Sequence, residues 1–127
     1  PATHTTPDPV GLQKLFADML DAGCTHCFME ASSHALDQDR LTGSQLTGGV
    51  FTNITHDHLD YHGDFNAYIG AKKLLFDRLP GAAFALTNAD ARHGDTMVQD
   101  TRARVVTYGT HQVADHKTRI VENTYIS

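Results

Sequence analysis

The densest group of chemically capable side chains lies between His56 and His62. Three histidines and two aspartates occupy five of these seven positions. Imidazole nitrogens and carboxylate oxygens are common protein ligands of divalent metal ions, and histidine also transfers protons near neutral pH. Such a density is not typical of a solvated loop. The stretch therefore predicts a metal-binding or catalytic site.

A zinc hydrolase is one interpretation of this stretch. Its spacing resembles the HxHxDH zinc motif of metallo-β-lactamase-type hydrolases as far as Asp60. Tyr61 then stands where the motif requires its last histidine, and His62 comes one residue late. This interpretation predicts a dinuclear zinc site built on His56, His58 and His62, with no requirement for ATP.

A carboxylate follows the short apolar run Cys27–Met29, which predicts a strand that ends at Glu30. In open parallel sheets, ligands bind beyond the carboxyl ends of the strands. Glu30 could hold a hard cation there, and the hydroxyls of Ser32 and Ser33 could contact a ligand or cap the next helix. A capping turn with an incidental glutamate is the alternative interpretation.

A lysine interrupts an apolar helix face. Phe65, Ile69, Lys72 and Phe76 are spaced by four, three and four residues, which places them on one side of a helix. Such a lysine ordinarily extends its ammonium group to water. Alternatively, desolvation favours the neutral amine, which can react with carbon dioxide to form a carbamate. A carbamate on Lys72 would be a long carboxylate able to bind or orient Mg²⁺.

The two cysteines, Cys24 and Cys27, have the spacing of metal-binding and redox pairs. A structural zinc site usually needs a second pair of ligands at matching spacing, and the chain has no further cysteine. We expect two reduced thiols packed near a core, consistent with a cytoplasmic location.

The elements that must position these residues alternate between helices and short strands. This pattern predicts an α/β domain of Rossmann-like type, with a largely parallel sheet and flanking helices. The expected helices cover residues 9–23, 64–78 and 92–101; the expected strands cover 27–29, 49–52, 84–86 and 105–108, with another beginning near 117. The first helix should be capped by Asp8 and the second by Asp64. Both ends of the chain resemble cut ends, which predicts a fragment of a larger protein.

Composition excludes several classes of function. Charged residues make up 20% of the 127 residues and the net charge is −5, which argues against a nucleic-acid or membrane-surface partner. No apolar run approaches the roughly 20 residues of a membrane span, and the first ten residues do not resemble a signal peptide.

Several motifs occur together and in the order found in one family. The chain resembles the central, ATP-using domain of the Mur ligases, and in particular those that extend UDP-N-acetylmuramoyl-L-alanyl-D-glutamate. The resemblance covers about residues 4 to 109. Its motifs are His4–Asp8, Glu30–Leu36, Val50–Thr55, Asp57–Gly63, Tyr68–Phe76 and Thr87–Asp90.

The resemblance implies a substrate site and a metal site. The residues implied to contact the UDP-MurNAc-dipeptide are Thr5, Thr6, Ser32, Gln38 and Arg40. Glu30 and His58 would be Mg²⁺ ligands and Lys72 would be the carbamylated lysine, so that these three form the catalytic group. No ligand role is implied for His56 or His62.

The implied reaction uses ATP and Mg²⁺. ATP phosphorylates the D-glutamate side chain, and the amine of diaminopimelate or lysine then displaces phosphate to form an amide. The chain has no G-x-x-G-K-[ST] phosphate loop. We therefore expect residues 1–127 to be part of one central domain, with the phosphate-loop segment, the uridine-binding domain and the amino-acid-binding domain lying elsewhere. The fragment alone should be inactive, and the complete enzyme a cytoplasmic monomer.

Two further classes stay open. Another Mur ligase step or a folylpolyglutamate synthase-like ligase would share the central domain. A non-catalytic domain that binds a sugar nucleotide or a partner would tolerate Lys72→Ala, whereas a ligase would not.

Overall fold

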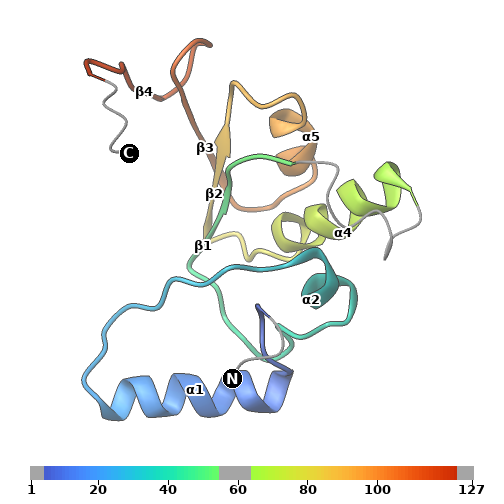
Figure 1. Cartoon of the computed structure of the whole chain (residues 1–127), viewed down its shortest axis with the longest axis vertical. Coiled ribbons are helices and arrows are strands. Elements are labelled where there is room, and N and C mark those ends of the chain that lie inside the picture. The colour runs from blue at the N-terminus through green and yellow to red at the C-terminus, as the bar shows by residue number, and fades with distance from the viewer. Residues whose placement is uncertain (1–4, 55–63, 123–127) are drawn as a thin grey trace, which may run out of the picture. The chain divides into compact units, whose positions relative to one another are not determined.

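The computed structural model describes residues 5–54 and 64–122. The chain divides into two compact units (Figure 1). The first unit comprises Pro1–Leu46 with His56–Leu75, and the second comprises Thr47–Thr55 with Phe76–Ser127. Each unit is described by itself.

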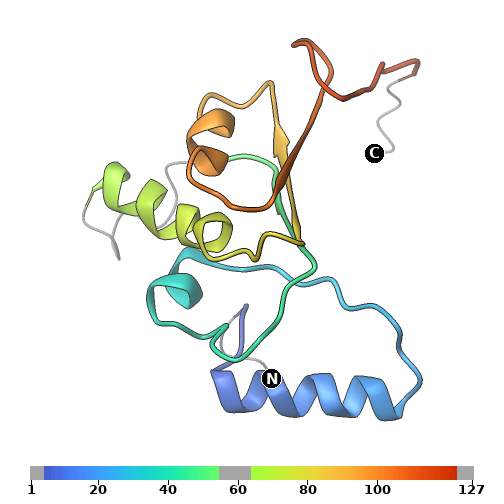
Figure 2. The ribbon, with the colours of Figure 1, turned by 180° about the vertical axis from the view of Figure 1, so that it is seen from behind.

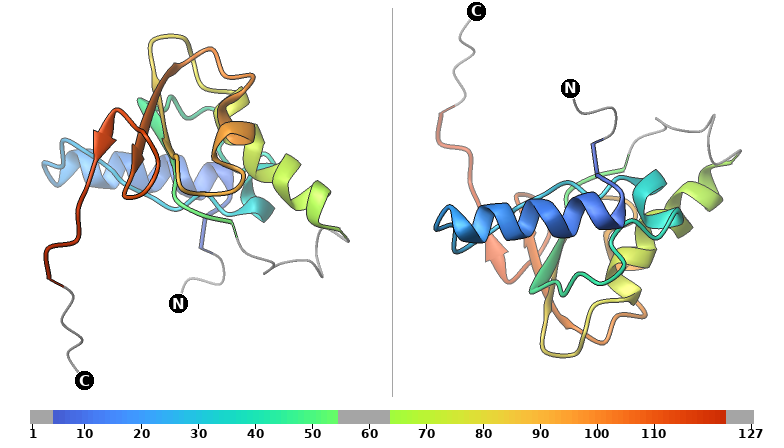
Figure 3. Two further views of the ribbon diagram at one scale, coloured as in Figure 1. Left: turned by 90° about the horizontal axis from the view of Figure 1, so that it is seen from above. Right: turned by 90° about the horizontal axis from the view of Figure 1, so that it is seen from below.

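The second unit contains a parallel sheet of four strands in the order β1-β2-β3-β4. The strands are β1 (Gly48–Phe51), β2 (Phe84–Asn88), β3 (Arg104–Gly109) and β4 (His116–Lys117). In the register, Val50 lies opposite Leu86, which lies opposite Val106. β4 pairs with the end of β3 through Tyr108 and Gly109 (Figure 3). The predicted α/β class with a parallel sheet is confirmed.

The core of the second unit is built from apolar side chains of the sheet and the segments between its strands. The rings of Phe51 and Phe76 meet edge to face, with centroids 6.4 Å apart. Leu79, Ala85 and Met97 are fully buried. Helix α5 (Gly94–Val98) packs beside β2, as Figure 2 shows from behind. Burying a large apolar side chain contributes about 1.5–3 kcal/mol, so these contacts stabilise the sheet that ends in the polar groups described below.

The first unit begins with α1 (Pro9–Asp21). The Asp8 carboxylate accepts a hydrogen bond of 2.9 Å from the Gly11 N–H, and proline occupies the first helical position. The predicted helix and its cap are confirmed. Of its predicted apolar face, Leu12 is fully buried, whereas Leu20 is 72% exposed.

Two further helices follow in the chain, α2 within the first unit and α4, whose last two residues belong to the second. Helix α2 (Ser33–Asp37) begins after Ser32, whose side chain accepts from the Ala35 N–H at 3.1 Å. Helix α4 (Phe65–Asp77) begins after Asp64, which accepts from the Ala67 N–H at 2.7 Å. The predicted Asp64 cap is therefore confirmed, and Ser32 forms the capping turn that was one of the two interpretations of its segment.

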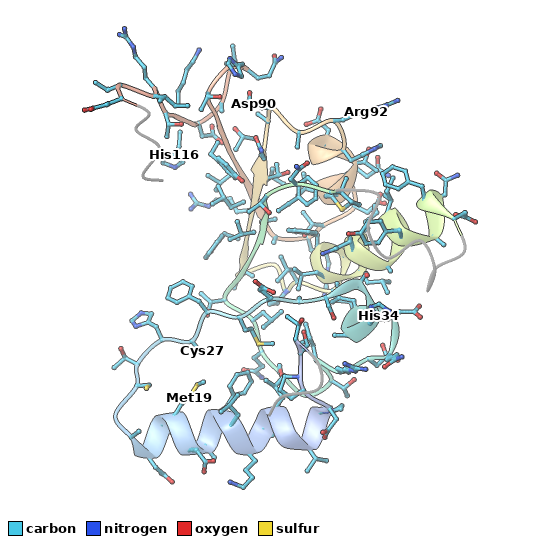
Figure 4. All side chains as sticks on the ribbon, in the orientation of Figure 1. Met19, Cys27, His34, Asp90, Arg92 and His116 are labelled. Carbon is cyan, nitrogen blue, oxygen red and sulfur yellow. The ribbon has the colours of Figure 1, made fainter. Side chains whose placement is uncertain are left out.

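The predicted strand at Cys27–Met29 is wrong. Residues 24–32 form neither helix nor strand, and Phe28 is 94% exposed. Cys24 and Cys27 are free thiols, but both are exposed rather than packed near a core. Cys27 is labelled in Figure 4. A strand requires a neighbour to satisfy its backbone groups, and the described residues place none beside this segment.

Two other boundaries differ from the prediction. The helix expected over 92–101 is limited to Gly94–Val98, and beyond its end the Thr101 hydroxyl donates to the Phe76 carbonyl at 2.6 Å. The strand expected from residue 117 contains only His116–Lys117 within the described chain, and residues 123–127 lie outside it. Across the described residues, no helix is long and apolar enough to cross a membrane.

Candidate functional site

The structure joins several of the sequence-predicted site residues in one hydrogen-bonded block of the first unit. The Thr6 hydroxyl donates to the Glu30 carbonyl at 2.9 Å and accepts from the Ser32 N–H at 3.3 Å. The Thr6 carbonyl accepts from Arg40 Nη1 at 3.0 Å. Residues separated by up to 34 positions are therefore tied together around Thr6.

Arg40 is held by a second partner. The Gln38 Oε1 atom accepts from Arg40 Nε at 3.1 Å and from Arg40 Nη2 at 2.6 Å. A guanidinium group fixed at three of its nitrogens is pre-oriented, which reduces the entropy lost when it binds a phosphate or carboxylate. The geometry therefore suits Arg40 to anion recognition.

The C-terminus of α2 explains why Arg40 lies near Thr6. Asp39 adopts the left-handed conformation, with φ of 53°. The Asp39 N–H donates to the Leu36 carbonyl at 3.3 Å, and the Arg40 N–H donates to the Ala35 carbonyl at 2.8 Å. These two bonds form a Schellman motif, which reverses the chain after the helix. Aspartate tolerates this backbone region better than most residues, although glycine is the usual choice.

The start of α2 contributes two serines with different surroundings. Ser32 caps the helix through its side chain and donates its N–H to Thr6. The Ser33 hydroxyl is buried and has no hydrogen-bond partner among the described residues. Thr5, next to Thr6 in the chain, and Gln38, which binds Arg40, are both exposed.

Lys72 has the environment of the second of its two interpretations, in which desolvation favours the neutral amine. Its side chain is half-buried, and its Nζ atom lies 5.9 Å from the centre of the Tyr68 ring. Desolvation lowers the pKa of the Lys72 amine below its usual value, and the negative charge of Glu30 acts in the opposite direction. A lowered pKa increases the fraction of neutral amine, which is the form that reacts with carbon dioxide.

Among the described residues, Glu30 is a candidate ligand for a hard cation. Glu30 offers an exposed carboxylate whose charge reaches Lys72, and a carbamate on Lys72 would add further oxygen ligands. His58 lies outside the described residues, as do His56, Asp57, Asp60 and His62. Within the described ranges, no three His, Cys, Asp or Glu side chains converge into a metal-binding group.

A polar network at the carboxyl ends of β1, β2 and β3 was not predicted. In the second unit, Asn88 Nδ2 donates to the Thr52 carbonyl at 2.9 Å, and the Tyr108 hydroxyl donates to the Phe51 carbonyl at 3.2 Å. These bonds connect three strand ends at the edge of the sheet where ligands bind in open α/β folds. The sequence indicates only that polar residues follow apolar strands, which does not predict these two hydrogen bonds.

Asp90 anchors the chain after β3 (Figure 4). Its carboxylate accepts from the Thr110 N–H at 2.6 Å, the Thr110 hydroxyl at 2.8 Å, the Gln112 N–H at 2.8 Å and the His111 N–H at 3.2 Å. These donors, led by the Thr110 and Gln112 amides, hold the pKa of Asp90 well below its usual value. Asp90 therefore fixes the turn over residues 110–112.

Relatives of known function align with nearly the whole chain. The chain is 58% identical over 123 residues to the UDP-N-acetylmuramoyl-L-alanyl-D-glutamate–2,6-diaminopimelate ligase of Cytophaga hutchinsonii, covering 97% of this chain and 25% of that protein. It is 41% identical to the ligase of the same name from Chlamydia trachomatis, covering 91% of this chain and 24% of that protein. The chain thus spans about a quarter of the length of the curated relatives it matches.

Structure and family agree with this similarity. A solved structure of a UDP-N-acetylmuramoyl-L-alanyl-D-glutamate–2,6-diaminopimelate ligase superposes with a TM-score of 0.78 at 37% identity, covering 88% of this chain and 24% of that chain. The family model described as the Mur ligase middle domain matches residues 1–125. The chain therefore belongs to the Mur ligase family, as part of its middle domain.

Proposed function

We propose that this chain is the middle-domain part of an ATP-dependent ligase that adds diaminopimelate to UDP-MurNAc-L-alanyl-D-glutamate. The observation that carries the proposal is the block formed by Thr6, Glu30, Ser32, Gln38 and Arg40, which brings the expected substrate residues together. The named activity of the relatives supports the choice of diaminopimelate over lysine. We further propose a cytoplasmic enzyme that acts as a monomer.

In this proposal the block recognises the anionic substrate. Arg40, oriented by Gln38 and Thr6, binds a phosphate or carboxylate group through the two N–H donors that these bonds leave, one on Nη1 and one on Nη2. Thr5, the neighbour of Thr6 in the chain, and Ser32, whose N–H binds Thr6, supply hydroxyl groups. Their combined effect is to hold the D-glutamate side chain in position, and positioning is a major source of catalysis when two substrates must react.

Glu30, His58 and a carbamate on Lys72 would hold Mg²⁺. When bound, this ion would neutralise negative charge on the phosphate groups during phosphoryl transfer. Lys72 prepares the site through its half-buried position, because desolvation favours the neutral amine that becomes a carbamate. The modification converts a cationic side chain into an anionic one.

The ATP phosphates would be held outside these 127 residues. The chain contains no glycine-rich phosphate loop and covers about a quarter of its relatives. We propose that the phosphate loop, the uridine-binding domain and the amino-acid-binding domain belong to the rest of a longer protein. The 127-residue chain alone should therefore release no ADP.

The test is ADP release by the full-length protein with UDP-MurNAc-L-alanyl-D-glutamate and either diaminopimelate or lysine. We expect activity with diaminopimelate, and a loss of roughly 100- to 1,000-fold in kcat for Lys72→Ala. Added short carboxylic acids should partly rescue that variant. Lys73→Ala removes a charge from the neighbouring helix position and is the matched control. Tight zinc binding with ATP-independent hydrolysis would refute the ligase in favour of the metal hydrolase.

A further inference from the structure

Thr6 differs from its neighbour Thr5 in where its side chain can act. Thr6 is fully buried, whereas Thr5 is exposed. The single hydroxyl proton of Thr6 is donated to the Glu30 carbonyl, and the same oxygen accepts the Ser32 N–H. A buried hydroxyl engaged in both directions has no proton to donate to a ligand.

We propose that Thr6 is a positioning residue that holds the Glu30–Ser32 main chain, and that its side chain does not contact the substrate. The effects of Thr6 on catalysis rest on the proposed function, whereas its hydrogen bonds do not. It assigns the two adjacent threonines different roles: Thr5 faces the ligand, and Thr6 fixes the residues on which the metal and substrate sites depend.

The need for such a residue follows from the segment that carries Glu30. Residues 24–32 lie in neither helix nor strand, so no ladder of backbone bonds fixes their course. Thr6 supplies a cross-link at Glu30 and another at Ser32, where the segment enters α2. Its carbonyl also accepts from Arg40. One residue thereby sets the relative positions of a candidate metal ligand, a helix cap and an anion-binding guanidinium.

The proposal is tested in the full-length protein with Thr6→Val, which keeps the shape but removes the hydroxyl, and Thr6→Ser, which keeps the hydroxyl. Both variants retain the carbonyl that binds Arg40. Residue-resolved hydrogen exchange should show the Ser32 amide exchanging about 10-fold faster in Thr6→Val, as loss of one hydrogen bond implies. Thr6→Ser should match the wild type.

Kinetics then separate positioning from direct contact. With Thr6→Val, we expect the Mg²⁺ concentration for half-maximal ADP release to rise about 5- to 10-fold, with lower kcat and recovery in Thr6→Ser. A hydroxyl that touched the substrate would instead raise the KM for UDP-MurNAc-L-alanyl-D-glutamate alone. Thr5→Val serves as the comparison, because it should show that KM effect and unchanged Ser32 exchange.

The exchange measurement keeps this inference distinct from the proposed function. A wild-type protein that releases no ADP would refute the ligase, yet Ser32 protection would still report on Thr6. If Thr6→Val fails to fold, the ligand-free wild type decides the question. A Ser32 amide that exchanges at the rate of an unprotected peptide overturns the positioning role, as does unchanged exchange in a folded Thr6→Val protein.

Discussion

Gly94→Ala should destabilise the second unit because the new methyl group would meet backbone. A Cβ atom at Gly94 would lie 2.2 Å from the Asn88 carbonyl oxygen and 3.3 Å from the Thr87 hydroxyl. The first distance is about 1 Å inside van der Waals contact. The main chain at the end of β2 or the start of α5 must therefore move.

The cost can be worked from the contacts that such a movement disturbs. Overpacking of this kind costs about 1–3 kcal/mol. The Thr87 hydroxyl also donates to the Gly94 carbonyl at 2.8 Å, and weakening that buried bond adds about 1 kcal/mol. The higher helix propensity of alanine offsets about 1 kcal/mol. We expect a net loss of about 2 kcal/mol, or a fall of roughly 6–8 °C in Tm for a chain of this size.

Gly48→Ala is the matched control. Its Cβ would lie 2.3 Å from the ring of Phe84, but the contact is with the far end of a side chain that is 37% exposed. Because this ring can rotate toward solvent, the loss should stay below about 1 kcal/mol. Urea unfolding and thermal melting of both variants measure the difference. Equal losses, or a neutral Gly94→Ala, would refute the distinction between a backbone and a side-chain obstacle.

Two further predictions concern one position in each unit. Gly70 lies inside α4 and is exposed, and no described atom lies within 4 Å of the place that an added Cβ would take. Gly70→Ala should therefore stabilise the protein by about 0.5–1 kcal/mol in the same unfolding assay, and a loss of stability would contradict this reasoning. The folded-state pKa of Asp90 is depressed, so its contribution is present above the unfolded pKa of about 4 and is lost as the pH falls below it. Asp90→Asn should therefore lower stability at pH 7 and flatten its decline between about pH 4 and 2, whereas an unchanged acid profile would contradict the anchoring role.

The elements that could be predicted from sequence are those with local signals. Asp8 and Asp64 cap helices through bonds to an N–H three residues later, and both lie where the apolar periodicity begins. The three longer strands were located within one or two residues, because short apolar runs bounded by polar residues are typical of parallel sheets. These assignments depend on contacts within a few residues of the chain.

The failures depend on partners distant in sequence. Cys27–Met29 has the composition of a strand, but composition cannot supply the adjacent strand that would pair with it. The helix expected over 92–101 ends at Val98, and Thr101 beyond it bonds through its hydroxyl to the Phe76 carbonyl, a partner 25 residues away. Neither the lack of a neighbouring strand nor the bond to Phe76 can be read from the local spacing of apolar residues.

In the candidate site, resemblance to the family identifies the residues but not the role of each side chain. Resemblance groups Thr5 with Thr6, although only the structure shows that one hydroxyl is exposed and the other is used internally. Burial and hydrogen-bond direction depend on the approach of Glu30 and Ser32, 24 and 26 residues away from Thr6. Arg40 reaches the Thr6 carbonyl after the turn at Asp39, whose backbone is left-handed. A motif therefore identifies which residues matter together, whereas the direction of each hydrogen bond decides which of them binds a ligand and which holds the others in place.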